Sequence, residues 1–99
     1  MYVITVIYDQ PTDPAAFDEY YRTKHLPLVD ALPDVRRFSW GKCESPAGSA
    51  PSAYAIAYLM FDSRSAALTA LSSPAGQAAT GDVENFATGG ATILFSEQD

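Results

Sequence analysis

Strands that are apolar on both faces constrain this fold more than any other feature of the sequence. β-branched and aromatic residues dominate the first nine positions, and the later stretch Ala53–Phe61 carries no charged side chain. Strands of this kind have to be covered on both sides. The two faces of the first strand are Tyr2, Ile4, Val6 and Tyr8, and Val3, Thr5, Ile7 and Asp9; in Ala53–Phe61 we expect Tyr54 and Tyr58 to share a face with Ile56 and Met60.

The predicted elements follow one another as strand, helix, strand, strand, helix and strand. This is the ferredoxin-like βαββαβ order of α+β proteins, in which a four-stranded antiparallel sheet carries its helices on one face. With 47% hydrophobic residues, positions 1–99 suit one domain with one core. After the first strand we expect a helix from Pro14, strands at Val35–Glu44 and Ala53–Phe61 around the loop Ser45–Ser52, helices through Leu71 and from Pro74 towards Ala87, a strand at Ala91–Phe95 and a polar tail at Ser96–Asp99.

Each helical stretch begins with a residue that can cap the backbone amides of its first turn. Pro27 has no backbone N–H, so the first helix should end or kink near His25 and continue as a short turn through Leu32. Gly81 is a point at which the last helix can be interrupted. The predicted N-caps are Asp13, Ser63 and Ser73, and a proline follows Asp13 and Ser73 at the favoured first helical position.

The helices can cover only one face of such a sheet. The other face would be a large exposed apolar patch on a monomer, and patches of that kind mark association sites. Closed two-fold symmetry is the commonest arrangement of homo-oligomers. The sequence therefore predicts a homodimer.

Charge and cysteine content exclude several classes of protein. A net charge of -6, with only six scattered basic residues, leaves no basic stripe for nucleic acid. Cys43 is the only cysteine, and no cluster has metal-ligand spacing, so we expect neither a disulfide nor a metal site. Known cofactor motifs are absent, and we expect no cofactor. The apolar opening Met1–Tyr8 resembles neither a signal peptide nor a membrane span, so the cytoplasm is the expected compartment.

Two ionisable residues occupy positions where the helical periodicity calls for apolar ones. His25 lies on the same face as Phe17 and Tyr21. Asp82 lies on the same face as Ala78, Val83 and Phe86. A carboxylate that orients one imidazole nitrogen leaves the other free to act as acid or base near neutral pH. Two other interpretations stay open: His25 as a core or capping histidine, and Asp82 as the N-cap of a helix that restarts at Gly81.

Aromatic residues supply the remaining candidates for a pocket. Tyr21, one turn before His25, is a candidate proton donor. For Tyr8 and Trp40, which lie on strands, the alternative is that they fill the core. The predicted catalytic residues are His25, Asp82 and Tyr21, and the predicted contacts to a small apolar or aromatic ligand are Tyr8, Phe17, Trp40 and Phe86.

Two segments resemble the EthD family of dimeric α+β barrel proteins. They are YDQPTDPAAFDEYYRTKHLPL, from Tyr8 to Leu28, and SPAGQAATGDVENFATGG, from Ser73 to Gly90. The resemblance implies that the sheet packs on that of a second copy to form a barrel, with a pocket between sheet and helices. It also places Tyr21, His25 and Asp82 at motif positions. Asp9-Gln10 departs from the Tyr-Pro step that relatives often have after Tyr8, and this concerns the rim of the pocket.

Two functions from different classes are compatible with these features. The relatives that give the EthD family its name are encoded beside a cytochrome P450 system that degrades ethyl tert-butyl ether, and similar folds include cyclases, isomerases and small cofactor-independent monooxygenases. One hypothesis is therefore a cofactor-independent enzyme that uses His25 with Asp82. The alternative is a non-catalytic binding or accessory protein that supports an oxygenase, which needs the pocket but no reactive base.

Overall fold

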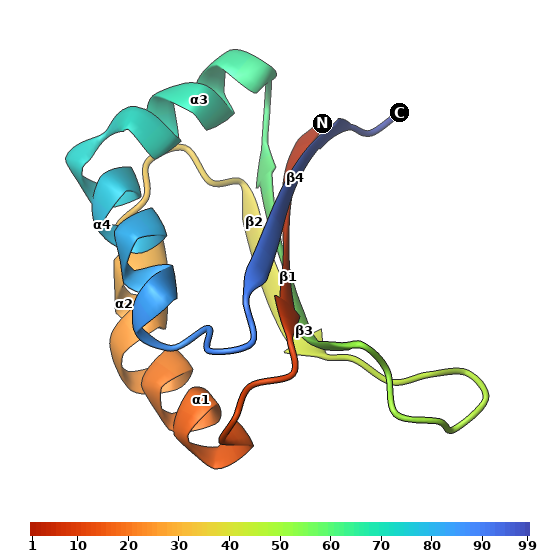
Figure 1. Cartoon of the computed structure of the whole chain (residues 1–99). Helices are drawn as coiled ribbons and strands as arrows, with labels where there is room; N and C mark the ends of the chain where they lie inside the picture. Colours follow the sequence, from red (N-terminus) through yellow and green to blue (C-terminus); the bar gives the residue numbers. More distant parts are fainter.

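A computed structural model describes residues 1–99, with one four-stranded antiparallel sheet and all helices on one side of it (Figure 1). The strand order β2-β3-β1-β4 puts β1 and β3 in the centre and β2 and β4 at the edges. This confirms the predicted ferredoxin-like α+β fold. The elements are β1 (Tyr2–Asp9), α1 (Pro14–Tyr20), η1 (Tyr21–His25), α2 (Leu26–Asp30), β2 (Arg37–Lys42), β3 (Ala53–Phe61), α3 (Arg64–Ser72), α4 (Pro74–Asp82), η2 (Val83–Asn85) and β4 (Ala91–Glu97).

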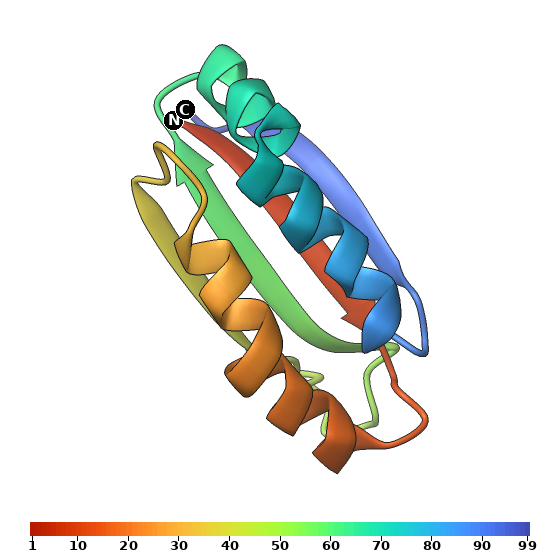
Figure 2. The same ribbon diagram turned by 90° about the vertical axis from the view of Figure 1, so that its left-hand side faces the viewer.

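The helices form two rows that lie side by side over the sheet (Figure 2). One row runs from α1 through η1 to α2, and the other consists of α3 and α4. All three predicted N-caps are confirmed, since the side chains of Asp13, Ser63 and Ser73 each accept a hydrogen bond from the backbone N–H three residues on. Small buried side chains, such as Ala67, Ala70 and Ala79, bring the second row close to its neighbours.

Several element boundaries differ from those predicted. Helix α2 ends at Asp30 and not at Leu32, and α3 ends at Ser72, one residue beyond Leu71. Strand β4 continues through Ser96 and Glu97, because β1 still offers Val3 and Tyr2 as partners there, so the expected polar tail is shorter. Strand β2 is confined to Arg37–Lys42 by the length over which it pairs with β3. Helix α4 passes through Gly81 without interruption and gives way to a 3-10 turn only after Asp82.

The first helix is not regular around His25. Residues Tyr21–His25 form a π-helical turn, in which the N–H of Leu26 donates to the carbonyl of Tyr21, five residues earlier. Pro27 explains the disturbance, because it cannot donate to the preceding turn as an α-helix requires. The chain absorbs the predicted kink as a wider turn and stays helical to Asp30. Residues five positions apart lie near one another across such a turn.

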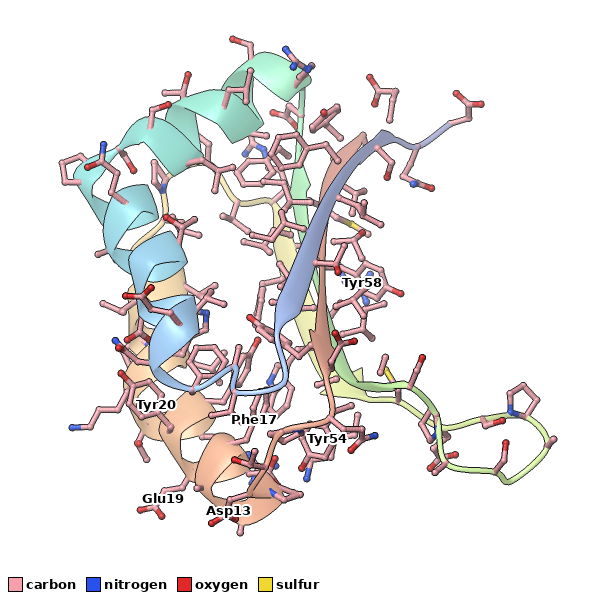
Figure 3. The ribbon with its side chains drawn as sticks, viewed as in Figure 1. Asp13, Phe17, Glu19, Tyr20, Tyr54 and Tyr58 are labelled. Carbon is pink, nitrogen blue, oxygen red and sulfur yellow. The ribbon has the colours of Figure 1, made fainter.

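A bulge in β3 changes the direction of Tyr54. Tyr8 pairs with Ala55 and Asp9 with Ala53, so Tyr54 is an extra residue in the ladder. Its ring packs against Phe17 of α1, with 5.1 Å between ring centroids. The expectation that Tyr54 shares a face with Tyr58 is therefore wrong, and Figure 3 shows Tyr54 near Phe17 and Tyr58 on the opposite side of the sheet.

The face of the sheet away from the helices is uncovered. It is mostly apolar along β1 and β3, whereas the edge strands add Arg37, Ser39, Thr92 and Ser96 to it. Tyr58 is 37% exposed and Leu94 is 52% exposed on this face. Since paired residues of an antiparallel sheet point to the same side, the register places on it Val3, Thr5 and Ile7 of β1, Ile56, Tyr58 and Met60 of β3, and Leu94 of β4. No helix has both the length and the apolar composition needed to cross a membrane.

Two glycines of α4 provide a matched test of how closely the start of α4 packs against the end of α3. A Cβ at Gly76 would lie 2.1 Å from the carbonyl oxygen of Ala70 and 2.5 Å from that of Leu71, whereas a Cβ at Gly81 would meet nothing within 4 Å. We expect Gly76→Ala to lower the free energy of unfolding by about 1–3 kcal/mol. Gly81→Ala should raise it by about 0.5–1 kcal/mol. Urea unfolding followed by circular dichroism measures both, and a Gly76→Ala protein as stable as the parent would contradict the close approach.

Candidate functional site

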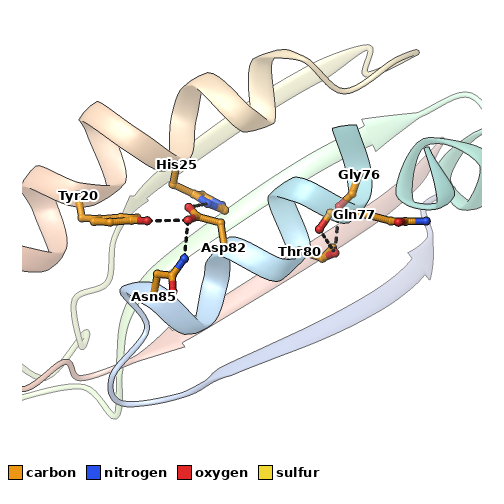
Figure 4. Close-up of polar contacts among 7 residues, drawn as sticks. All are labelled: Tyr20, His25, Gly76, Gln77, Thr80, Asp82 and Asn85. Atoms are coloured by element: carbon orange, nitrogen blue, oxygen red, sulfur yellow. Dashed lines mark hydrogen bonds and ion pairs between the residues drawn. The ribbon is translucent and has the colours of Figure 1, made fainter. Parts of the chain in front are cut away.

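Asp82 is a buried carboxylate that accepts hydrogen bonds from three side chains (Figure 4). Its Oδ1 accepts from the Tyr20 hydroxyl at 2.6 Å and from the Asn85 amide at 3.0 Å. Its Oδ2 lies 3.0 Å from Nδ1 of His25. Only 9% of Asp82 and 4% of His25 are exposed. The expected proximity of His25 and Asp82 is confirmed, and their catalytic role stays a prediction.

The carboxylate fixes the proton on the His25 ring. An ionised carboxylate can only accept, so Nδ1 of His25 must donate, and in the neutral ring Nε2 then carries the lone pair. Nε2 has no hydrogen-bond partner in the protein. Burial lowers the pKa of His25, and the hydrogen bond to Asp82 only partly offsets this, so the ring is neutral at pH 7.

Asp82 itself stays ionised. Burial opposes its ionisation, but the hydrogen bonds from Tyr20, Asn85 and His25 outweigh burial and lower the pKa of Asp82. The alternative that Asp82 caps a restarted helix is wrong, because α4 is continuous and the Asp82 side chain makes no capping hydrogen bond to η2. The hydrogen bonds of the carboxylate are therefore all with side chains, and its full negative charge lies beside a neutral imidazole.

A small apolar cavity lies between the helices and the sheet, next to His25. Its volume is about 60 Å³, and thirteen of its fifteen lining residues are hydrophobic, with His25 and Thr80 the exceptions. Thr80 and Ile93 are exposed, so the cavity reaches the surface between α4 and β4. Asp82 is not among the lining residues. The expectation that both ionisable groups face the cavity therefore holds only for His25, because Asp82 lies behind the imidazole.

Two tyrosines bring phenol groups to the wall of this cavity. Tyr21 is fully buried, its ring centroid is 5.3 Å from that of His25, and its hydroxyl has no hydrogen-bond partner. Tyr8 lies beside it, with 5.7 Å between the ring centroids. Burial raises the pKa of Tyr8 to about 12 and raises that of Tyr21 as well. Both phenols therefore stay protonated at neutral pH, and each keeps one hydrogen to donate.

The other aromatic candidates lie outside the cavity wall. Phe17 packs with 5.3 Å between its centroid and that of Phe86, and Trp40 packs against Tyr21 at 4.4 Å. None of Phe17, Trp40 or Phe86 lines the apolar cavity. They instead form a cluster that supports the rings of Tyr21 and His25, because large aromatic side chains fill the space between α1 and the sheet. Phe17 and Phe86 also contribute to a second cavity of about 170 Å³ near the start of α1.

Sequence reasoning gave no role to Tyr20 or Asn85, which complete the set of donors to Asp82. The π turn between Tyr20 and His25 brings residues five positions apart closer to one direction than a regular α-helix does, and both side chains reach Asp82. The signal for Asn85 was its spacing of three residues from Asp82, at which side chains on a helical surface meet. No group of three or more His, Cys, Asp or Glu side chains is placed to hold a metal ion.

The single histidine makes stability depend on pH in a defined window. The unfolded chain takes up the proton near the ordinary histidine pKa of about 6.5, whereas burial lowers the pKa of His25 in the folded state. The contribution of the neutral His25 ring to the free energy of unfolding is therefore fully present above about pH 6.5. It is lost as the pH falls towards the pKa of His25 in the folded protein. We expect the free energy of unfolding to fall by up to about 1.4 kcal/mol per pH unit in this range.

Urea unfolding at a series of pH values between 5 and 7 measures this dependence. His25 is the only histidine in the chain, so His25→Gln should flatten the profile there. A parent profile that is already flat would show that His25 titrates normally in the folded protein.

Comparison with known proteins places these features in a family. The EthD domain matches residues 9–90. An uncharacterized 11.0 kDa protein of the thcB-thcC intergenic region of Rhodococcus erythropolis is 54% identical over 99 residues, which is 100% of this chain and 96% of that protein. The crystal structure of an EthD family protein of Bacillus halodurans is 28% identical, with a TM-score of 0.93 over 100% of this chain and 99% of the other.

More distant structures share the fold. A dimeric ferredoxin-like protein of Jannaschia is 15% identical, with a TM-score of 0.74 over 99% of this chain and 100% of the other. A hydroxynitrile lyase of Passiflora edulis is 16% identical, with a TM-score of 0.75 over 99% of this chain and 94% of the other. At these identities the likeness concerns the fold alone. The domain match over most of the length and the relative that is 54% identical show that the chain belongs to the EthD family.

Proposed function

We propose that the protein is a cofactor-independent enzyme that moves a proton on a small, neutral, apolar or aromatic carbonyl compound, with His25 as the base. One observation carries this proposal: the neutral imidazole has its Nδ1 hydrogen-bonded to a buried carboxylate, while its Nε2 has no partner in the protein and the residue lines an apolar cavity. A base that only filled the core would not need an orienting carboxylate on one nitrogen and a free lone pair on the other.

The lining of the cavity supports a neutral ligand. No Lys or Arg side chain contributes to the wall, so a carboxylate or phosphate would have no partner in an apolar surrounding. A volume of about 60 Å³ corresponds to roughly four to six water-sized groups at 10–15 Å³ each. The ligand is therefore compact. We expect its polar atom to accept a hydrogen bond from the Tyr21 hydroxyl, which has no partner in the protein.

The proposed reaction is an isomerisation by proton transfer. Nε2 of His25 takes a proton from the carbon next to the carbonyl, and the electron pair of that C–H bond forms an enolate. The enolate oxygen accepts a hydrogen bond from the Tyr21 phenol, and the carboxylate of Asp82 stabilises the imidazolium. His25 then delivers a proton to another atom of the substrate, so the reaction consumes no further reactant. The imidazolium can exchange its proton with solvent before this delivery, and in heavy water the substrate then takes up deuterium.

A binding or accessory role is the second candidate. The EthD relatives are named for the degradation of an ether, and a small apolar cavity would equally serve a protein that holds such a compound for an oxygenase. This function requires the cavity and the Tyr21 hydroxyl but no proton transfer at His25. The two candidates therefore differ in one measurable property, which is exchange of ligand protons with solvent.

Exchange in heavy water tests the proposal without knowledge of the natural substrate. We expect the protein to speed the replacement of hydrogen by deuterium next to the carbonyl of at least one of butanone, cyclobutanone and cyclopentanone, as followed by NMR. His25→Gln should lower the rate by about 10²–10⁴-fold, the usual contribution of a general base. Tyr21→Phe should lower it as well, since the enolate loses its donor.

Binding measured in parallel separates the two candidates. Thermal shift with the same three compounds should report binding to the parent and to His25→Gln. Binding to the parent without accelerated exchange would reject the enzyme and leave the accessory role.

We infer also that two copies associate through the uncovered face of the sheet. This face presents exposed Tyr58 and Leu94 beside the buried Val3 and the half-buried Ile7. Burying such a face is favourable by about 25 cal/mol per Å² of apolar surface. The Jannaschia protein of the same fold is described as dimeric, which supports the inference.

A charge placed on this face should separate the copies. We expect the parent to have the mass of a dimer by light scattering at micromolar concentration, and Leu94→Lys to shift it towards the monomer, because a lysine would be buried without a partner. Thr69→Lys, on the exposed side of α3, adds the same charge away from the face and should leave the mass unchanged. A monomeric parent would contradict the inference.

A further inference from the structure

The two oxygens of Asp82 have different tasks. Oδ2 meets His25 alone, whereas Oδ1 accepts from both Tyr20 and Asn85. The two donors come from different parts of the chain: Tyr20 ends α1, and Asn85 belongs to η2 directly after α4. Figure 4 shows them on one side of the carboxylate, with His25 above the other oxygen. The carboxylate is thus held from both helical rows.

The donors also separate the carboxylate from the surface. Tyr20 and Asn85 both line the second cavity, of about 170 Å³, which contains Thr12 and Thr88 as well. His25 lines the apolar cavity and not this one. Asp82 therefore lies between two cavities, with the donors to Oδ1 facing one of them and the imidazole facing the other.

We propose that Tyr20 and Asn85 are positioning residues that act on His25 through Asp82: they hold the carboxylate and reduce its basicity, so that the imidazole stays neutral with its Nε2 lone pair at the cavity. The inference rests on the proposed function for its catalytic meaning, since a neutral imidazole matters most if it is a base. Neither residue lines the cavity that His25 faces, so their effect on a ligand there is indirect.

The physical reason lies in how a carboxylate shares its charge. Each donor to Oδ1 stabilises the anion and lowers its affinity for a proton, as the lowered pKa of Asp82 reflects. A less basic carboxylate attracts the second proton of the imidazole less strongly. The other titratable groups around His25 are the phenols of Tyr8 and Tyr21, and both are uncharged at neutral pH. Burial is the largest cause of the lowered pKa of His25, and Asp82 is the charged group that opposes this shift.

This mechanism predicts a change whose sign differs from that of a structural defect. Removal of a donor, in Tyr20→Phe or Asn85→Ala, should leave a more basic carboxylate and raise the pKa of His25 by roughly 0.5. Removal of the carboxylate charge, in Asp82→Asn, should lower the pKa of His25. A Tyr20→Phe substitution that merely displaced Asp82 would move the pKa in the same direction as Asp82→Asn.

NMR titration of the His25 ring measures these shifts without any substrate, and the single histidine makes the signal unambiguous. Tyr54→Phe is the matched control, because it also removes a phenol that donates to a carboxylate, here Asp18 at 2.8 Å, away from His25. We expect no change in this variant. An unchanged or lowered pKa in both Tyr20→Phe and Asn85→Ala would overturn the proposal.

The pH dependence of ketone exchange separates this inference from the proposed function. If both hold, the acid limb of the exchange rate moves to higher pH in Tyr20→Phe, in step with the NMR titration. A raised pKa in a protein that exchanges no ketone would support the positioning role and reject the enzyme. Accelerated ketone exchange together with an unchanged pKa of His25 in Tyr20→Phe would support the enzyme and reject the positioning role.

Discussion

The burial of one charged carboxylate is the constraint on which the helical layer depends. Asp82 can remain ionised away from water only because three donors surround it, and these come from both rows of helices. The hydrogen bond from Tyr20 joins residues 62 positions apart. The same contacts that stabilise the charge therefore align α1 and η1 with α4 and fix which nitrogen of His25 holds its proton. Architecture and chemistry share one set of hydrogen bonds.

The sequence predicts the frame of this arrangement well. Alternating apolar strands and capped helices lead to the correct order of elements, and helical periodicity identifies His25 and Asp82 as inward-facing ionisable groups. The contribution of Tyr20 could not be predicted, because its direction depends on a π turn, and Pro27 indicates only that the helix is disturbed. Tyr54 escapes prediction for a related reason: one extra residue in β3 reverses its side, and no local signal marks the bulge.

The aromatic residues show how the core divides its space. Phe17, Trp40 and Phe86 pack around the rings of Tyr21 and His25 on one side, while aliphatic residues such as Val29 and Leu59 surround the cavity on the other. The imidazole lies at the border between the two regions. Flat rings in mutual contact leave little free space, whereas branched side chains at the cavity leave room for a ligand. Tyr8, Tyr21 and Phe38 also line the cavity, so the residue type alone does not decide which aromatic side chains reach it.

The π turn also makes the number of residues in the first helix a property of the site. A π turn amounts to one additional residue inserted into a helix whose ends are otherwise unchanged. Deletion of a single codon within Arg22–Lys24 would restore the ordinary helical repeat and rotate the preceding turn by about 100°. Tyr20 would then leave Asp82, although every side chain of the hydrogen-bonded group was still encoded. For this family, gaps of one residue in an alignment deserve as much weight as substitutions.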